Sequence, residues 1–320
     1  MTDFIHLHVH TYYSLLDGQS PINQLVDKAV KDGMKGMAIT DHGNMFGIKD
    51  FFDYCQKVNK KRKKEGMEPF KPIFGCEMYV ARRGNKSYKE HRQDMGGWHL
   101  VVLAKNEVGY HNLIRLVSRS WVDGFYMHPR TDFADLERYH EGLIISSACL
   151  GGEIPQHIMH GDMDAAAQRV EWFKSIWGDD FYLELQRHEV KDPAILANRE
   201  TYQEQKKVEP YLLELARRYN VKVICTNDSH FVNEDNAEAH DHLLCLSTGK
   251  ELNDPNRMRY SKQEWFKTRA EMEQVFSDIP EALTNTVEIL DKVEVYDIEN
   301  PPIMPCRTRL GAQNWATILG

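Results

Sequence analysis

Short apolar runs alternate with longer stretches of helical periodicity along most of the chain. This alternation is typical of β–α units arranged around a parallel sheet or barrel. Seven of the runs have the length and the β-branched or apolar content of strands. Seven strands with helices between them suit a barrel of about 250 residues. The predicted strands cover residues 4–9, 36–40, 72–80, 98–104, 142–148, 181–186 and 221–226.

Helix boundaries are also marked in the sequence. Pro21 opens a predicted helix that ends near Gly33, because proline suits a first helical turn and glycine suits the residue after a last turn. Asp162 is expected to cap a helix that Gly178 closes. A long polar helix is predicted over residues 197–219.

The strand pattern stops after residue 230, and two helical patterns follow over residues 261–276 and 279–293. We therefore expect three parts, a barrel over 1–245, a helical appendage over 246–298 and a tail over 299–320. The tail is first rich in proline and then irregular, which is typical of a linker or a truncated end.

Composition narrows the class of protein. The chain has 320 residues, of which 42% are hydrophobic, and this content can build a core. Its 40 Lys and Arg against 48 Asp and Glu give a formal charge of −8, which argues against a generally basic, nucleic-acid-coating protein. No run approaches the roughly 18 apolar residues of a membrane span, and the six cysteines form no CxxC pair. We expect a cytoplasmic protein with no membrane partner and no disulfide framework.

The histidines add a candidate metal site to these conclusions from composition. Three of the 15 histidines, His6, His8 and His10, fall within five positions. On an extended strand they would share one face, because alternate side chains point the same way. A shared cation would keep such packed imidazoles neutral. The alternative is a mixture of surface and core histidines, which is the commoner meaning of an isolated HxH pattern.

The positions of other metal-capable side chains favour the cation. Most of them follow a predicted strand and so fall at the carboxyl rim, where barrel enzymes build their active sites. These candidates exceed the four ligands of one tetrahedral zinc ion, so two or three ions are expected. A cluster of this kind hydrolyses phosphate esters. The candidates at the rim are His8, His10, Asp41, His42, Glu77, Cys149, Asp228 and His230, with His99 inside the fourth strand and Asp17 on a loop that can fold back.

Several motifs resemble those of the polymerase and histidinol phosphatase (PHP) domain, in the form found at the amino terminus of bacterial DNA polymerase III alpha subunits. They include HLHVHTYYSLLDG, ITDHGNMFG, GCEMYV, GLIISSACLGGEIPQ and VICTNDSHFV, and the resemblance runs from about residue 3 to 298. It implies a distorted seven-stranded α/β barrel with a trinuclear centre of Zn, Mn or Fe. Placed by motif, the metal ligands and catalytic residues are His8, His10, Asp17, His42, Glu77, His99, Cys149, Asp228 and His230.

The resemblance also implies a function, a metal-dependent 3′–5′ exonuclease that proofreads DNA and acts at the DNA 3′ end. Two alternatives stay open. One is a structural module that stabilises the polymerase and docks a separate proofreading exonuclease subunit, and the other is a small-molecule phosphatase of the histidinol type. Because the chain carries no polymerase triad of aspartates, we expect no polymerase activity from it. We expect it to be the amino-terminal piece of a longer DNA polymerase, with the rest of that chain as its partner.

Further side chains are predicted around the ligands. Asp162 and Asp164 are expected to cap a helix, Cys76 to lie in the core, and the HxH of His240 and His242 to be helical, where residues two apart do not face each other. We expect four side chains to support the ligands from behind, namely His6, Asp41, Glu184 and His188. Basic side chains that could meet a DNA backbone, or equally belong to solvated loops, are Arg82, Arg83, Lys86, Arg92 and Arg130.

Overall fold

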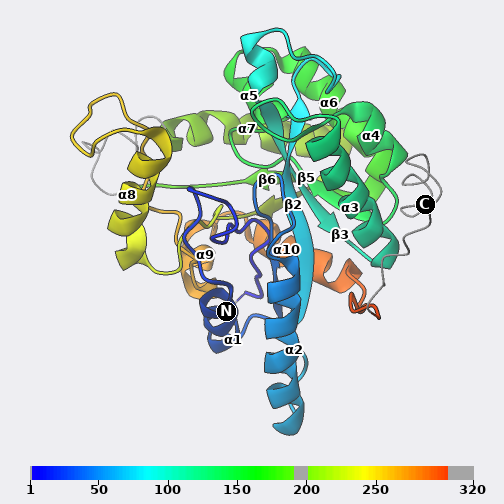
Figure 1. Cartoon of the computed structure of the whole chain (residues 1–320), viewed down its shortest axis with the longest axis vertical. Coiled ribbons are helices and arrows are strands. Elements are labelled where there is room, and N and C mark those ends of the chain that lie inside the picture. Colours follow the sequence, from blue (N-terminus) through cyan, green and yellow to red (C-terminus); the bar gives the residue numbers. More distant parts are fainter. Residues whose placement is uncertain (1, 191–200, 302–320) are drawn as a thin grey trace, which may run out of the picture.

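Seven strands form one curled, mixed sheet in the computed structural model of the chain, which describes residues 2–190 and 201–301. The sheet makes a half-barrel with helices around it, so the predicted α/β class is confirmed (Figure 1). The strand order is β1-β2-β3-β5-β6-β7, and β4 pairs with β2. The strands are β1 (Gly36–Ile39), β2 (Lys71–Ala81), β3 (Gly97–Ala104), β4 (Arg130–Thr131), β5 (Leu143–Ser146), β6 (Phe181–Leu185) and β7 (Lys222–Cys225).

Strand β3 runs opposite to both of its neighbours. It is antiparallel to β2 and to β5, whereas the other strand pairs are parallel. The prediction of a parallel sheet was therefore wrong for β3. The connection between β2 and β3 carries a short 3₁₀ helix, η1 (Arg92–Met95), and not the α-helix of a parallel crossover. As a result the start of β3, with His99, lies at the rim where the parallel strands end.

The first predicted strand is extended but does not join the ladder as a strand. Toward β1, the carbonyl oxygens of His6 and Val9 accept hydrogen bonds from Ala38 and Thr40, both at 2.8 Å. On its other side Val9 forms an isolated parallel bridge with Ser229. The Val9 amide donates to the Thr40 hydroxyl at 2.9 Å and not to a backbone carbonyl. A side-chain acceptor in place of a backbone carbonyl interrupts the regular hydrogen bonding of a β-sheet. The segment therefore lies between β1 and the chain after β7, with only isolated backbone contacts on each side.

Three helix boundaries are where the sequence predicts them. The first helix, α1 (Ile22–Lys31), follows Pro21, and α6 (Met163–Trp177) is capped by the Asp162 side chain and ends at Gly178. The predicted helix over 197–219 corresponds to α7 (Gln203–Tyr219), and residues 197–200 lie outside the described residues. Figure 1 shows α3 (Glu107–Val122) and α4 (Phe133–Arg138) on the opposite side of the molecule from α8 (Ala237–Thr248). The remaining helices of this part are α2 (Ile48–Lys64), α5 (Glu153–Met159) and the 3₁₀ helix η2 (Gly178–Asp180).

After β7 the chain forms η4 (Glu234–Asn236), α8 (Ala237–Thr248), α9 (Arg269–Val275) and α10 (Pro280–Lys292). The predicted helix over 279–293 is confirmed by α10, but only α9 is helical within 261–276. Residues before α9 are instead tied to the chain after β7, since the Phe266 amide donates to the Phe231 carbonyl at 2.9 Å.

One core joins the sheet and the helices around it. Leu283 and Ile289 of α10 belong to the same buried cluster as the strands, and Cys76 lies in that cluster as predicted. The division at residues 245 and 298 stays a prediction. The five cysteines that the structure describes are free. Within residues 2–190 and 201–301, no helix is both long enough and apolar enough to cross a bilayer.

Candidate metal centre

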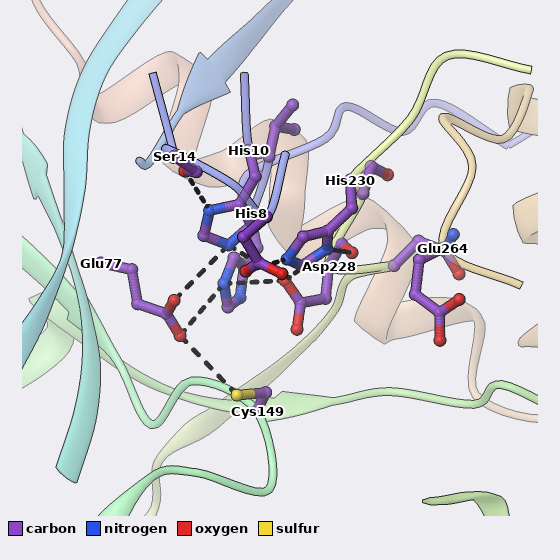
Figure 2. A network of polar contacts seen from close by, with 12 residues as sticks. His8, His10, Ser14, Glu77, Cys149, Asp228, His230 and Glu264 are labelled. Atoms are coloured by element: carbon purple, nitrogen blue, oxygen red, sulfur yellow. Dashed lines mark hydrogen bonds and ion pairs between the residues drawn. The ribbon is translucent and has the colours of Figure 1, made fainter. Parts of the chain in front are cut away.

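The nine predicted ligands come together at the rim of the half-barrel, several of them labelled in Figure 2. Three come from the amino-terminal segment, two lie on strands, and four follow strand ends. Ligand-capable atoms gather in three groups, in each of which they lie within 4.8 Å of one another. The groups are His10 with His42 and His230, His8 with His10 and Asp228, and His42 with Glu77 and His99.

Glu77 lies at the centre of the network. Its Oε1 is 3.3 Å from His8 Nε2 and 2.9 Å from His99 Nδ1. Its Oε2 is 2.7 Å from His42 Nδ1 and 3.5 Å from His10 Nε2. Burial alone would raise the pKa of this carboxyl, but His99, His8 and His42 hold the pKa well below its usual range. One ionised carboxylate therefore faces four imidazoles, as a carboxylate that bridges cations would.

Asp228 supplies a second shared carboxylate. Its Oδ1 lies 3.2 Å from both His8 Nε2 and His10 Nε2. Its backbone has a φ of 46°, in the left-handed region that costs free energy for a residue with a side chain. Burial would raise the pKa of Asp228, but the neighbouring His8 and His230 lower it strongly. The strained backbone thus turns an ionised side chain toward the histidines.

Asp17 is placed by a loop that folds back over the site, as the sequence predicts. Its Oδ2 is 2.8 Å from His42 Nε2 and 3.2 Å from His230 Nε2. The Tyr260 hydroxyl donates to the same carboxylate at 3.1 Å, and His240 Nε2 donates to the Asp17 backbone carbonyl at 2.8 Å. Neither contact was predicted, because both partners are distant from Asp17 in the chain, Tyr260 belongs to no motif, and the HxH of His240 and His242 was expected only to be helical.

His99 and Cys149 lie at one edge of the centre. Cys149 Sγ is 3.5 Å from His99 Nδ1 and 3.7 Å from Glu77 Oε1. Burial and the nearby carboxylate of Glu77 raise the pKa of this thiol well above its usual value. A thiol ligates metals as the thiolate, so only a cation at this edge would favour the ligating form.

Five buried polar atoms at the centre face one another in ion-pair contacts, but none of them has a hydrogen bond of regular geometry. Leaving such an atom unpaired costs about 1–3 kcal/mol, so five of them pointing at one another demand an explanation. Positive ions that accept all these lone pairs supply one. Imidazole, carboxylate and one thiol are ligands that suit transition metals and zinc, so the residues fit a group of divalent ions. The five atoms are His8 Nε2, His10 Nε2, His42 Nδ1, Glu77 Oε2 and Asp228 Oδ1.

Glu184 and Asp41 fix two of the histidine rings from behind. His8 Nδ1 donates to Glu184 Oε1 at 2.7 Å, since a carboxylate can only accept. His10 Nδ1 donates to the Ser14 hydroxyl at 2.8 Å, and the Ser14 hydroxyl in turn donates a hydrogen bond to Asp41 Oδ1 at 2.7 Å. Nδ1 is thereby engaged in both rings, and Nε2 is the nitrogen that faces the centre and is available to ligate a cation. Ser14 was missed by the sequence analysis, because a serine is not metal-capable and carries no motif signal.

The other two predicted supporting residues differ from each other. His188 Nε2 donates to the Asn227 carbonyl at 3.0 Å and so braces the residue before Asp228. His6 Nε2 instead lies 2.8 Å from the Lys267 carbonyl, and its ring packs on Phe266. His6 belongs to none of the three ligand groups. The expectation of one shared face for the three histidines was therefore wrong, because this segment is not a regular strand.

The basic side chains predicted to contact DNA fall into two groups, those buried inside the fold and those for which contact stays a prediction. Arg130 has no exposed surface, and its guanidinium donates to three backbone carbonyls at 2.8–3.1 Å. Its assignment to DNA contact was wrong, since the side chain is used inside the fold. Lys86 is likewise buried and lies 2.5 Å from Asp135. Arg82 lies over an indole ring at 4.7 Å, and Arg83 forms a 3.3 Å ion pair, so contacts of these two with DNA stay predictions.

A cavity of about 230 Å³ adjoins the centre. Its wall contains the predicted ligands Cys149 and Asp228, and the segment after α8 contributes Tyr260 and Glu264. The centre is therefore next to a space that a substrate can enter.

Comparison with known proteins gives two kinds of match. Residues 6–188 match the PHP domain family. The chain is 43% identical over 306 residues to DNA polymerase III subunit alpha of Borreliella burgdorferi, an alignment that covers 94% of this chain and 25% of that protein. It is 38% identical over 335 residues to DNA polymerase III subunit alpha of Thermus aquaticus, with 99% and 26% covered. The chain thus spans about a quarter of the length of these curated relatives.

Among solved structures, a histidinol phosphate phosphatase from Lactococcus lactis, complexed with zinc, L-histidinol and phosphate, is 13% identical with a TM-score of 0.32. The match covers 83% of this chain and 99% of that one. This likeness is too distant to support an argument about the site.

Proposed function

Because the chain belongs to the PHP domain family, we propose that it is the metal-dependent phosphoesterase domain of a DNA polymerase III alpha subunit. Its activity in this proposal is a 3′–5′ exonuclease that removes nucleotides from a DNA 3′ end, in the cytoplasm. One observation carries the proposal, namely the five buried polar atoms, none with a hydrogen bond of regular geometry, that converge beside a cavity.

We propose two or three divalent ions as the resident cofactor, with Zn, Mn and Fe as the candidates. Glu77 and Asp228 each face more than one histidine, which supports their sharing between ions. The same nine side chains would hold the ions and form the catalytic site. They are His8, His10, Asp17, His42, Glu77, His99, Cys149, Asp228 and His230.

When bound, such ions acidify water and offset the negative charge of a phosphodiester. The residues of this chain supply the arrangement around them. Glu184 and Ser14 keep the His8 and His10 rings turned so that Nε2 faces the centre. Tyr260 and His240 hold the Asp17 loop closed over it. The carboxylates are held ionised by the histidines, so they are ready to ligate without losing a proton.

Arg82 and Arg83 follow the strand of Glu77, and we propose that they contact the DNA backbone without reading its sequence. Charge from two arginines offsets part of the repulsion between a polyanion and a chain of net charge −8.

A second candidate function is to brace the polymerase and to dock a separate proofreading subunit. It is favoured by a surface patch of large apolar side chains, since the chain spans only about a quarter of its relatives and the rest of the polymerase would be available to cover the patch. The indole nitrogen of Trp121 donates to the Gly43 carbonyl at 2.8 Å, so the patch is next to the ligand His42. Its exposed members are Phe46, Trp121 and Phe125, whose rings contact one another through Trp121.

The test is to incubate the purified protein with a 3′-labelled single strand and manganese or zinc. We expect label to be released only when metal is present. The double variant His8→Ala with Asp228→Ala is expected to release none. His242→Ala is the matched control, because this histidine bonds only to the Glu238 carbonyl on its own exposed helix face. Absence of release, or release that the double variant retains, would refute the exonuclease. A panel with histidinol phosphate separates the small-molecule phosphatase.

A further inference from the structure

Besides Asp228 of the metal centre, the wall of the cavity contains a second carboxylate with an oxygen that has no hydrogen-bond partner, that of Glu264. Glu264 is only 3% exposed. Its Oε1 accepts hydrogen bonds from the Ser261 amide at 3.0 Å and the Ser261 hydroxyl at 2.5 Å, whereas its Oε2 has no hydrogen-bond partner. A buried carboxylate oxygen without a donor is unfavourable. The cavity is therefore suited to a ligand that supplies one.

Five donor side chains of the cavity wall are already engaged. Gln186 Nε2 donates to Glu184 and to a threonine, and Gln205 Nε2 bonds to His188 Nδ1 at 3.1 Å. His188 Nε2, the Arg259 guanidinium and the Tyr260 hydroxyl donate to other groups of the protein. The wall thus has an acceptor to offer and few free donors. Beside Glu264 it suits an uncharged, hydrogen-bond-donating group, because a phosphate at that position would face the negative charge of the carboxylate.

The position of the cavity relative to the metal centre indicates which part of a substrate would occupy it. Asp228 and Cys149 belong both to the metal centre and to the cavity wall. In the view of Figure 2, Glu264 lies beyond Asp228 on the side away from Glu77. A phosphodiester at the centre would therefore place the adjoining nucleoside in the cavity.

We propose that this cavity binds the last nucleoside of a DNA strand and that Glu264 accepts a hydrogen bond from its free 3′-hydroxyl. The inference rests on the proposed phosphoesterase function and specifies its substrate. An internal nucleoside carries a phosphodiester on its 3′ oxygen, and that negative charge would face the buried carboxylate. Glu264 would then select chain ends by attraction to a hydroxyl and by repulsion of a phosphate.

The experiment compares oligo-dT strands that end in a 3′-hydroxyl, a 3′-hydrogen or a 3′-phosphate, using the metal-loaded protein. We expect kcat/KM to be about 10- to 100-fold higher for the hydroxyl end than for the other two, as for a hydrogen bond to a charged acceptor. In Glu264→Gln the preference over the phosphate is expected to collapse, because the amide can donate to phosphate while its oxygen still accepts from Ser261. Equal cleavage of the three ends, or an undiminished preference in Glu264→Gln, would overturn the proposal.

Further arms separate the possible causes. Thymine has no exocyclic amino group, whereas cytosine has one. If strands ending in dC are preferred and strands ending in dT are not, the donor to Glu264 belongs to the base, and the proposed bond from the 3′-hydroxyl is overturned. Bis(p-nitrophenyl) phosphate has no nucleoside, so the loss of kcat/KM in Glu264→Gln is expected to be much smaller for it than for the hydroxyl-ended strand, and an equal loss on both substrates would overturn the proposal. Glu271→Gln is the matched control, since this carboxylate caps Thr268 and lies outside the cavity.

If no substrate is cleaved, the proposed phosphoesterase function is refuted. A binding measurement still tests the role of Glu264 in that case. Thymidine 5′-monophosphate is expected to raise Tm more than thymidine 3′,5′-bisphosphate does, and Glu264→Gln is expected to remove that difference. Equal shifts from the two nucleotides in the unchanged protein would overturn the inference. Metal content and Tm without nucleotide test whether Glu264→Gln is folded. If the variant is unfolded, the difference in Tm shift between the two nucleotides in the unchanged protein decides the inference.

Discussion

His8 Nδ1 lies 2.7 Å from Glu184 Oε1, and neither side chain has exposed surface. Glu184 also accepts from the hydroxyls of Ser146 and Thr226, each at 2.5 Å. The carboxylate is therefore held by the sheet while it holds the imidazole. Its effect on the metal centre is indirect, through the direction in which His8 Nε2 presents its lone pair.

Glu184→Gln is expected to weaken metal binding by about 10- to 100-fold, which is the usual effect of losing such a supporting contact. The amide keeps the shape but offers one acceptor in place of two, so the His8 ring is held less firmly. Metal titration followed by elemental analysis measures the change. Unaltered affinity in a folded variant would contradict the role assigned to Glu184.

Ser14→Ala is expected to reduce metal affinity by up to about 10-fold, because the ring of His10 loses its link to Asp41. Asp41 keeps its two bonds from Thr11, so the loop is expected to stay folded. Ser277→Ala, on the exposed surface, is the control for loss of a serine hydroxyl. Equal affinity in the two variants would show that the Ser14 link has no influence on the centre.

Metal removal is expected to destabilise the protein, since a ligand that binds only the folded state adds about 2.7 kcal/mol at a hundredfold excess over its Kd. Calorimetry before and after chelation measures the fall in Tm. The double variant His8→Ala with Asp228→Ala serves as control and is expected to show a much smaller response to chelator. A chelator effect of the same size in both proteins would place the stabilising metal elsewhere.

Arg130→Ala is expected to lower the free energy of unfolding by about 3 kcal/mol or more, because three backbone carbonyls lose their donor. Urea unfolding measures this loss. Arg82→Ala is expected to leave stability nearly unchanged and to weaken binding of a DNA strand. The reverse pattern, with Arg130 affecting DNA binding in a stable protein, would restore the original assignment.

Burial lowers the pKa of Lys267 from 10.5 to about 8. Between these two values the unfolded chain holds a proton that the folded chain has released, so this lysine makes the free energy of unfolding rise with pH. Its share is about 3 kcal/mol at most. Lys267→Met keeps the stem and removes the charge, so the difference in stability between the two proteins is expected to shift over pH 8 to 10.5. A constant difference from urea unfolding across that range would contradict a depressed pKa.

The convergence of eight of the nine candidate ligands was predictable, because these metal-capable residues lie in or beside predicted strands, whose ends meet at one rim, whereas Asp17 reaches the rim from a loop. The reversed direction of β3 was not, since a run of apolar residues does not show which way it pairs. Arg130 was misjudged because basic character along the sequence does not reveal burial. Ser14 and Tyr260 have ordinary side chains whose roles depend on contacts through space, with Tyr260 lying 243 residues from Asp17. Such contacts leave no local pattern to find.

The isolated bridge between Val9 and Ser229 has a consequence for the order of folding. It joins the first ligands of the chain to the last, and the contact from His230 to Asp17 spans 213 residues. Contacts so distant in sequence close large loops and form late and slowly. His8 and His10 are synthesised first, but the candidate ligand set is complete only when residues 228–230 have been added and have packed against them. If the proposed ions bind, metal uptake is therefore expected to follow the folding of almost the whole described chain.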